Sequence, residues 1–165
     1  MITAKSITGE KTQVDEKDLV WAINLYAVVV KDGKVLISPQ WKDNGYDFPG
    51  GHLELGEMHL DGLVREVKEE TGFVVKPTNV IDVFTSFFMH PRKKRPQQSI
   101  KIYYAAEIVS GEISTDGFDE GELSYARPAR FATLDELKTM EFMCTNQEPL
   151  NSIFSYLEKV LKEQR

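Results

Sequence analysis

The pattern of hydrophobic and polar positions predicts a β-hairpin early in the chain. Residues Trp21 to Val30 are mostly apolar and rich in β-branched side chains, and a second apolar run covers Val35 to Ser38. Asp32-Gly33 between them supplies the positive φ angles that a tight turn requires. A shorter hairpin is expected upstream, from Ala4 to Val14 about Gly9-Glu10.

A helical period follows a loop that we expect from Pro39 to Gly56. Apolar residues recur at i, i+3, i+4 and i+7 between Glu57 and about Thr71, so this segment is predicted to be an α-helix with one face packed on the core. Gly72 can end the helix in a left-handed conformation. The apolar positions are Leu60, Leu63, Val64 and Val67.

Two strands and two further helices are predicted after this helix. The strand-like runs cover Val80 to Phe88 and Ile100 to Ile108, and a last helix carries an apolar face from Leu150 to Leu161. Between them, Thr133 to Glu136 resembles a capping box that opens a short helix. Strands, helix, strands and helix in this order indicate an α+β fold with a mixed sheet and helices packed on it. No repeat or linker interrupts it, so residues 1–165 are expected to be one domain.

Composition and charge narrow the class of partner. The 165 residues include 26 acidic and 20 basic side chains, for a formal charge of −6, which argues against general affinity for a nucleic-acid backbone. A small anion would need a local cation or a metal held by the acidic groups. No apolar run approaches the roughly 20 residues of a membrane span, and the N-terminus lacks a hydrophobic signal core. We therefore expect a cytoplasmic protein without membrane contact; its single cysteine excludes an internal disulfide.

The acidic residues of the central helix gather on one side of it. At roughly 100° per residue, Glu66, Glu69 and Glu70 fall within an arc of about 100° beside the apolar stripe. Like charges held together cost stability, and a divalent cation would remove the repulsion. Carboxylate oxygens are the ligands that Mg²⁺ and Mn²⁺ prefer, while nothing in the sequence supplies the His and Cys set of a zinc site.

Three glutamates alone would usually be a solvated acidic face, but their surroundings favour a site. The segment Phe48-Pro49-Gly50-Gly51 precedes the helix, and its glycines allow the backbone to approach a ligand or metal closely. Arg65 adjoins the cluster and can hold the carboxylate of Glu57 or Glu66 in a bidentate grip.

These residues together resemble the complete Nudix box. Gly51, five residues, Glu57, seven residues and then Arg65-Glu66-Val67-Lys68-Glu69-Glu70-Thr71-Gly72-Phe73 match it without a departure. Seven positions require one residue type, so accidental agreement has a probability of about 10⁻⁸ per starting point. The box covers only residues 51–73, but the predicted elements around it are also similar to the family's α/β/α sandwich.

The resemblance implies a pyrophosphohydrolase that cleaves a nucleoside diphosphate linked to another group, by attack of water on phosphorus with Mg²⁺ or Mn²⁺ bound. Glu66, Glu69 and Glu70 would be the metal ligands, joined by the Gly50 carbonyl. Glu57 and Arg65 would orient them, and Glu66 is favoured as the acceptor of the water's proton. Some family members use a carboxylate in a later loop instead, for which the candidates are Asp119, Glu120 and Glu122.

Several alternatives stay open at this point. The main rival is a Nudix-like domain that binds a nucleotide or metabolite without cleaving it, although such a domain should have lost ligands that are present here. An isomerase of a diphosphate lipid precursor would want a cysteine in the site. The substrate-binding residues are unknown, and oxidised nucleoside triphosphates, ADP-ribose, dinucleotide polyphosphates, NADH, nucleotide sugars and capped RNA all remain open. Because dimers are common in the family, the resemblance also leaves a homodimer open.

Overall fold

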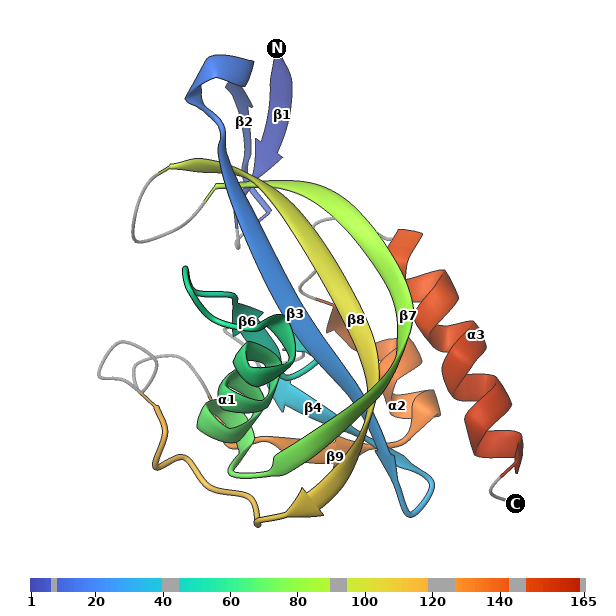
Figure 1. Ribbon diagram of the computed structural model, residues 1–165. Helices are drawn as coiled ribbons and strands as arrows, with labels where there is room; N and C mark the ends of the chain where they lie inside the picture. Colours follow the sequence, from blue (N-terminus) through green and yellow to red (C-terminus); the bar gives the residue numbers. More distant parts are fainter. Residues whose placement is uncertain (7–8, 40–44, 90–94, 119–126, 143–147, 164–165) are drawn as a thin grey trace.

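The computed structural model describes residues 1–6, 9–39, 45–89, 95–118, 127–142 and 148–163, which form a mixed sheet flanked by helices (Figure 1). The strands of the sheet follow the order β10-β5-β4-β3-β8-β7-β1-β2, with β6 paired to β3 and β9 to β4. The strands are β1 (Ile2–Lys5), β2 (Lys11–Val14), β3 (Val20–Lys31), β4 (Lys34–Pro39), β5 (Gly45–Asp47), β6 (Gly50–His52), β7 (Val74–Met89), β8 (Pro96–Ser110), β9 (Arg130–Ala132) and β10 (Glu141–Phe142). The helices are the 3-10 helix η1 (Glu16–Asp18) and the α-helices α1 (His59–Thr71), α2 (Leu134–Thr139) and α3 (Glu148–Glu163).

Both predicted hairpins are confirmed. Strands β3 and β4 pair antiparallel across Asp32 and Gly33, whose φ angles of 50° and 72° are the positive values expected of this turn. Strands β1 and β2 pair antiparallel from Ile2 to Val14. Gly9 lies in their connection with a φ of 85°. In Figure 1 this N-terminal hairpin lies at the opposite end of the long strands from the β3–β4 turn.

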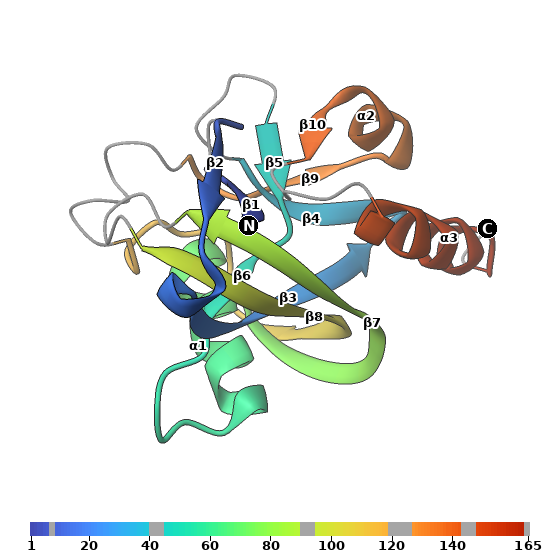
Figure 2. The same cartoon turned by 90° about the horizontal axis from the view of Figure 1, so that it is seen from above.

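Helices cover the two faces of the long strands, as an α/β/α sandwich requires. Strand β3 alternates between the faces: Leu25 packs in a core with α1, whereas Val28 packs in a second core with α2 and α3. Leu63 and Val67 of α1 belong to the first core; Leu137 of α2 and Ile153 and Leu157 of α3 belong to the second. Figures 1 and 2 show α1 and α3 apart, on either side of β3, β8 and β7. In the described part of the chain, no helix is long and apolar enough to cross a membrane.

The central helix confirms the helical period and its predicted end. Gly72 takes a left-handed conformation with a φ of 81°, and its N–H donates to the Lys68 carbonyl oxygen at 2.8 Å. The helix begins at His59, two residues after the predicted start, because the Glu57 carboxylate accepts a hydrogen bond from the Glu54 backbone N–H in the preceding loop. Leu60 is 41% exposed and not part of the packed face, since it lies in the first turn, at the rim of the core.

Other boundaries also differ from the prediction. The expected loop from Pro39 to Gly56 contains β5 and β6, two strands of three residues each. These strands are too short, and too rich in glycine, to leave a periodic signal. Strands β7 and β8 are longer than predicted and extend to Met89 and Pro96. The capping box at Thr133 is present, with Glu136 as its reciprocal partner.

Candidate active site

The Glu70 carboxylate joins α1 to two neighbouring strands. Its Oε2 accepts a hydrogen bond from the Ser38 hydroxyl of β4 at 3.0 Å and another from the Gly50 N–H of β6 at 3.1 Å. Strand β6 is held in turn by β3, where Gly50 lies opposite Tyr26 and Gly51 opposite Leu25. The last turn of the helix and the glycine turn are therefore fixed against each other.

Arg65 connects the other acidic residues of the box. Its Nε and Nη2 donate to the two carboxylate oxygens of Glu57 at 2.8 and 3.0 Å, which is the bidentate grip that the sequence predicted. Its Nη1 donates to Glu66 at 2.8 Å and to Glu69 at 3.1 Å. The hydrogen bond from Arg65 holds the pKa of Glu57 below its ordinary value, and Glu57 and Glu66 raise the pKa of Arg65. One guanidinium thus fixes three carboxylates around it.

The two glycines of the turn are needed for close contacts. A Cβ atom on Gly51 would lie 2.3 Å from Oε2 of Glu66, so the Glu66 carboxylate packs directly on the glycine. A Cβ atom on Gly50, whose φ is 148°, would lie 2.0 Å from the Leu25 carbonyl oxygen. The first contact involves a flexible side chain and the second the backbone of β3, so the two positions have different roles.

We expect Gly51→Ala to lower kcat/KM by roughly ten- to a hundredfold with little loss of fold, because the new methyl group must push the Glu66 carboxylate out of position. Gly50→Ala should instead lower the melting temperature strongly, since the methyl group would overlap the backbone of β3. Gly56→Asn is the control: its φ of 87° suits asparagine and no atom lies within 4 Å of the added Cβ. Equal activity of Gly51→Ala and the control would contradict the prediction.

Burial and neighbouring negative charges both disfavour the ionised form of Glu70. The pKa of Glu70 is raised to about 8, chiefly by burial and also by the negative charges of Glu66 and Asp47, while the hydrogen bonds from Gly50 and Ser38 act in the opposite direction. Burial also raises the pKa of Asp47 to about 6, against the opposing effects of the Lys101 ammonium and the Phe48 N–H. The site therefore holds more negative charge than its surroundings stabilise.

Sequence reasoning missed Ser38, Asp47 and Lys101, which surround the cluster from β4, β5 and β8. Asp47 directly precedes the Phe48-Pro49-Gly50-Gly51 turn, and its place in the sequence could have marked it as a neighbour of the site. Ser38 and Lys101 lie in ordinary strand patterns and carried no such signal.

The donor set suits a hard divalent cation. Glu66, Glu69 and Glu70 offer carboxylate oxygens, and the crowding of negative charge around Glu70 is what a bound cation would relieve. Among the described residues, no three His, Cys, Asp or Glu side chains are grouped closely enough to hold a metal ion as they stand. Glu66 and Glu69 contact Arg65, while Glu70 contacts Ser38 and Gly50. A cation would therefore draw the first two carboxylates away from the guanidinium.

The structure brings together Glu57, Arg65, Glu66 and Glu69 in one hydrogen-bonded group, and Glu70 and Gly50 in another beside it. The later-loop candidates Asp119, Glu120 and Glu122 lie outside the described residues. The segment leading to them packs on α1, where a Cβ atom on Gly117 would lie 2.4 Å from the Glu69 carbonyl oxygen.

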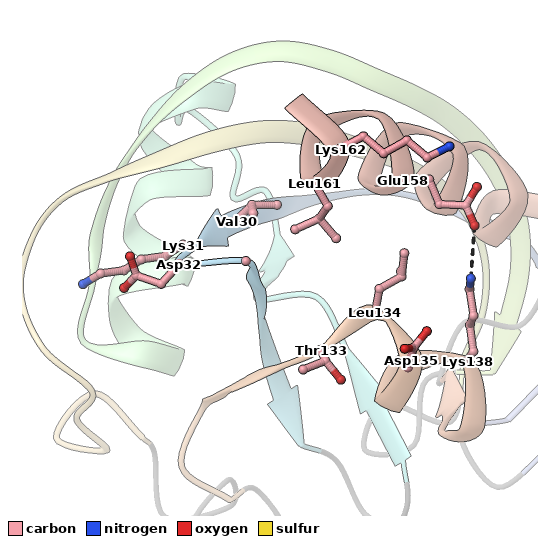
Figure 3. A pocket seen from close by; sticks show the side chains of 11 residues that line it. Val30, Lys31, Asp32, Thr133, Leu134, Asp135, Lys138, Glu158, Leu161 and Lys162 are labelled. Carbon is pink, nitrogen blue, oxygen red and sulfur yellow. Dashed lines mark hydrogen bonds and ion pairs between the residues drawn. The ribbon is translucent and has the colours of Figure 1, made fainter. Parts of the chain in front are cut away.

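A hollow of about 850 Å³ lies elsewhere, between the β3–β4 turn, α2 and α3 (Figure 3). An ion pair between Lys138 and Glu158 at 3.1 Å crosses one side of it. No residue from 51 to 73 lines it, so this hollow is separate from the carboxylate site.

Comparison with known proteins identifies the family. The model of the NUDIX domain matches residues 20–150, which is most of the chain. The chain belongs to the Nudix family. The family generally uses divalent metal ions, in agreement with the oxygen-rich site.

The relatives are named as hydrolases. The ADP-ribose pyrophosphatase of Methanocaldococcus jannaschii is 30% identical over 125 residues, which cover 73% of this chain and 67% of that protein. The putative ADP-ribose pyrophosphatase YjhB of Bacillus subtilis is 28% identical over 87 residues, covering 53% of this chain and 41% of the relative. The predicted class, a Nudix pyrophosphohydrolase, is therefore confirmed, and nothing in the comparisons favours the non-catalytic alternative.

Solved structures confirm the fold. A crystal structure of a UDP-X diphosphatase superposes with a TM-score of 0.62 at 19% identity, covering 88% of this chain and 65% of that one. An ADP-ribose pyrophosphatase from Streptococcus suis superposes with a TM-score of 0.58 at 20% identity, covering 82% and 90% of the two chains. The predicted α+β Nudix fold is the fold of this chain.

Proposed function

We propose that this Nudix protein hydrolyses the diphosphate bridge of a nucleoside diphosphate linked to another group, with Mg²⁺ or Mn²⁺ as the cofactor. The observation that carries the proposal is the arrangement of Glu66, Glu69 and Glu70 on one face of α1, beside the turn at Gly50 and Gly51. Loss of these ligands would be expected of a domain that only binds nucleotides, and the box has lost none of them.

Each box residue has a proposed role. Glu66, Glu69, Glu70 and the Gly50 carbonyl would hold the metal, which when bound neutralises phosphate oxygens and acidifies water. Arg65 and Glu57 are positioning residues, because the guanidinium holds the carboxylates through hydrogen bonds of 2.8 to 3.1 Å. Glu66 would accept the proton of the attacking water, since its carboxylate lies directly against Gly51 at the turn.

ADP-ribose is our first candidate substrate. The relatives from Methanocaldococcus jannaschii and Bacillus subtilis are both named for its pyrophosphatase activity, the second as putative. A putative 8-oxo-dGTP diphosphatase of Bacillus subtilis, 31% identical over 105 residues, makes an oxidised nucleoside triphosphate the second candidate. The two candidates differ in what is attached to the nucleoside phosphate: a second sugar phosphate or a diphosphate.

The test is a substrate panel with products identified by mass. The protein is incubated with ADP-ribose, 8-oxo-dGTP, NADH, a dinucleotide polyphosphate, a nucleotide sugar and capped RNA, with Mg²⁺, with Mn²⁺ and with EDTA. We expect AMP and ribose 5-phosphate from ADP-ribose, and no turnover in EDTA. Repetition with Glu69→Gln should remove turnover, whereas equal turnover by the wild type and this variant would refute the ligand assignment.

Three further statements are part of the proposal. Residues 1–165 act as one Nudix domain, the protein works in the cytoplasm without binding membranes or nucleic acids in general, and a homodimer is the assembly to be tested first. Sedimentation of the purified protein tests the assembly directly.

A further inference from the structure

A row of buried polar side chains continues from the second core along the sheet. Ser99 and Lys101 of β8 are buried, Lys101 to 6% exposure, and Ser86 of β7 is only 1% exposed. Asn24 of β3 donates a short hydrogen bond from its amide to the Ser99 hydroxyl. Sheet faces buried in a protein are usually apolar, so three buried polar side chains beside the half-buried Asn24 need a reason.

The strand register places these side chains on one face. Ser86 lies directly opposite Ser99 in the antiparallel β7–β8 pair, and Asn24 lies opposite Lys101 in the β3–β8 pair. Ser86 and Lys101 are diagonal neighbours, for which the spacing in a sheet is roughly 7 Å. The row thus presents hydroxyl, amide and ammonium groups within the span of one small ligand.

Ser86 supplies the observation that points to a ligand. Its hydroxyl is buried and has no hydrogen-bond partner among the described residues. An unsatisfied buried hydroxyl destabilises a fold, and such groups in native proteins usually have a bound partner or a functional role. Its cross-strand neighbour Ser99 accepts a hydrogen bond from the Asn24 amide and makes none with Ser86, so a bound ligand is one group that could satisfy the Ser86 hydroxyl.

Lys101 connects the row to the carboxylate site. Its ammonium lies 5.5 Å from the ring centre of Tyr26, and Tyr26 is paired with Gly50 across β3 and β6. The N–H of Gly50 in turn donates to the Glu70 carboxylate at 3.1 Å. The row and the Glu70 carboxylate are thus connected through the paired strands β3 and β6, and a ligand with a phosphate at the carboxylates would extend along the sheet toward Lys101 and Ser86.

We propose that Asn24, Ser86, Ser99 and Lys101 form a subsite for a sugar phosphate, with Lys101 binding a phosphate oxygen and Ser86 a sugar hydroxyl. This inference rests on the proposed function, because it names the part of the substrate that lies beyond the cleaved bridge. The subsite favours a nucleoside diphosphate that carries a phosphorylated sugar over a nucleoside triphosphate, whose terminal diphosphate has no hydroxyl for Ser86.

The test measures binding to the metal-free protein in EDTA, so that it does not depend on turnover. Ribose 5-phosphate and inorganic phosphate are titrated separately by ligand-observed NMR. Lys101→Met should weaken the binding of both probes by about tenfold, since both use the ammonium. Ser86→Ala should weaken the binding of ribose 5-phosphate by about fivefold and leave the binding of inorganic phosphate unchanged, because only the sugar reaches the hydroxyl.

Stability provides the second readout. A serine that serves only the fold should destabilise it when truncated, whereas removal of an unpaired buried hydroxyl should leave the melting temperature unchanged or raise it. Matched controls are Ser155→Ala on α3 and Lys76→Met near the other end of β7, both exposed and outside the row. Neither should change the binding of either probe.

The outcomes separate this inference from the proposed function. An unchanged ratio of the two dissociation constants in Ser86→Ala, or a wild-type protein that binds neither probe, would overturn the subsite. Loss of ribose 5-phosphate binding in Ser86→Ala would support it even if no member of the substrate panel were hydrolysed. Turnover of the panel without any effect of Ser86→Ala or Lys101→Met on binding would leave the hydrolase proposal intact and reject the subsite.

Discussion

Glu70→Gln is expected to lower kcat about a thousandfold and, in the same molecule, to raise the melting temperature of the metal-free protein. The loss of activity is expected because Glu70 is one of the proposed anionic metal ligands, and a thousandfold loss is an effect of roughly 4 kcal/mol on the barrier. The gain in stability follows because Glu70 is a poorly solvated carboxylate close to Glu66 and Asp47. Glutamine keeps an oxygen that accepts the hydrogen bonds of Ser38 and Gly50. A gain of about 2 kcal/mol would correspond to roughly 4–8 °C.

The stability gain should depend on pH in a defined direction. The folded protein raises the pKa of Glu70 from its ordinary 4.5 to about 8, so the folded state binds more protons than the unfolded state between these values. Wild-type stability therefore falls as the pH rises from about 4.5 to about 8, while that of Glu70→Gln does not share this decrease. The difference between the two proteins should be largest above pH 8 and vanish below pH 4.5.

Thermal unfolding in EDTA across this pH range measures the effect. Glu10→Gln is the control, since it removes an exposed carboxylate near the β1–β2 turn. A melting temperature of Glu70→Gln at or below that of the wild type at pH 9 would show that the ionised Glu70 carboxylate does not destabilise the fold. Addition of Mg²⁺ should then stabilise the wild type more than the variant, because only the wild type offers the third carboxylate.

Sequence periodicity predicted the elements that bury large faces. The amphipathic period of α1, the apolar runs of β3, β7 and β8, and the Asp32-Gly33 turn all carry local signals that tertiary packing reinforces. The box also predicted the hydrogen bonds of Arg65. Glu66 and Glu69 follow the arginine by one and four positions on the same helix, and Glu57 precedes it by eight positions in the loop before the helix.

The parts of the site that come from other strands could not be predicted. Ser38 and Lys101 come near the site only through the pairing of β3 with β4 and β8, and the local pattern of one strand does not say which distant strand will pair with it. Strands β5 and β6 escaped prediction because each has only three residues, which is too short for a periodic pattern, and β6 pairs with β3 more than twenty residues earlier in the chain. The carboxylates could thus be predicted from one segment of the sequence, whereas their neighbours on other strands could not.

Arg65→Met is expected to lower kcat/KM about a hundredfold and to lower the melting temperature, the opposite effect on stability from that of Glu70→Gln. The guanidinium makes four hydrogen bonds to the carboxylates of Glu57, Glu66 and Glu69, and its removal leaves these like charges facing one another. Loss of groups that orient metal ligands typically costs ten- to a hundredfold in metal affinity or activity. Methionine keeps the apolar part of the side chain, so the change reports on the charge and hydrogen bonds.

Arg65→Lys distinguishes orientation from charge. Lysine restores the positive charge but cannot donate two parallel hydrogen bonds to Glu57, so it should recover most of the melting temperature and little of the activity. Metal titration followed by thermal unfolding should show weaker Mg²⁺ binding in both variants. Full activity of Arg65→Lys would mean that Arg65 acts only as a counter-charge, and that the geometry of the carboxylates is set by α1 and the glycine turn alone.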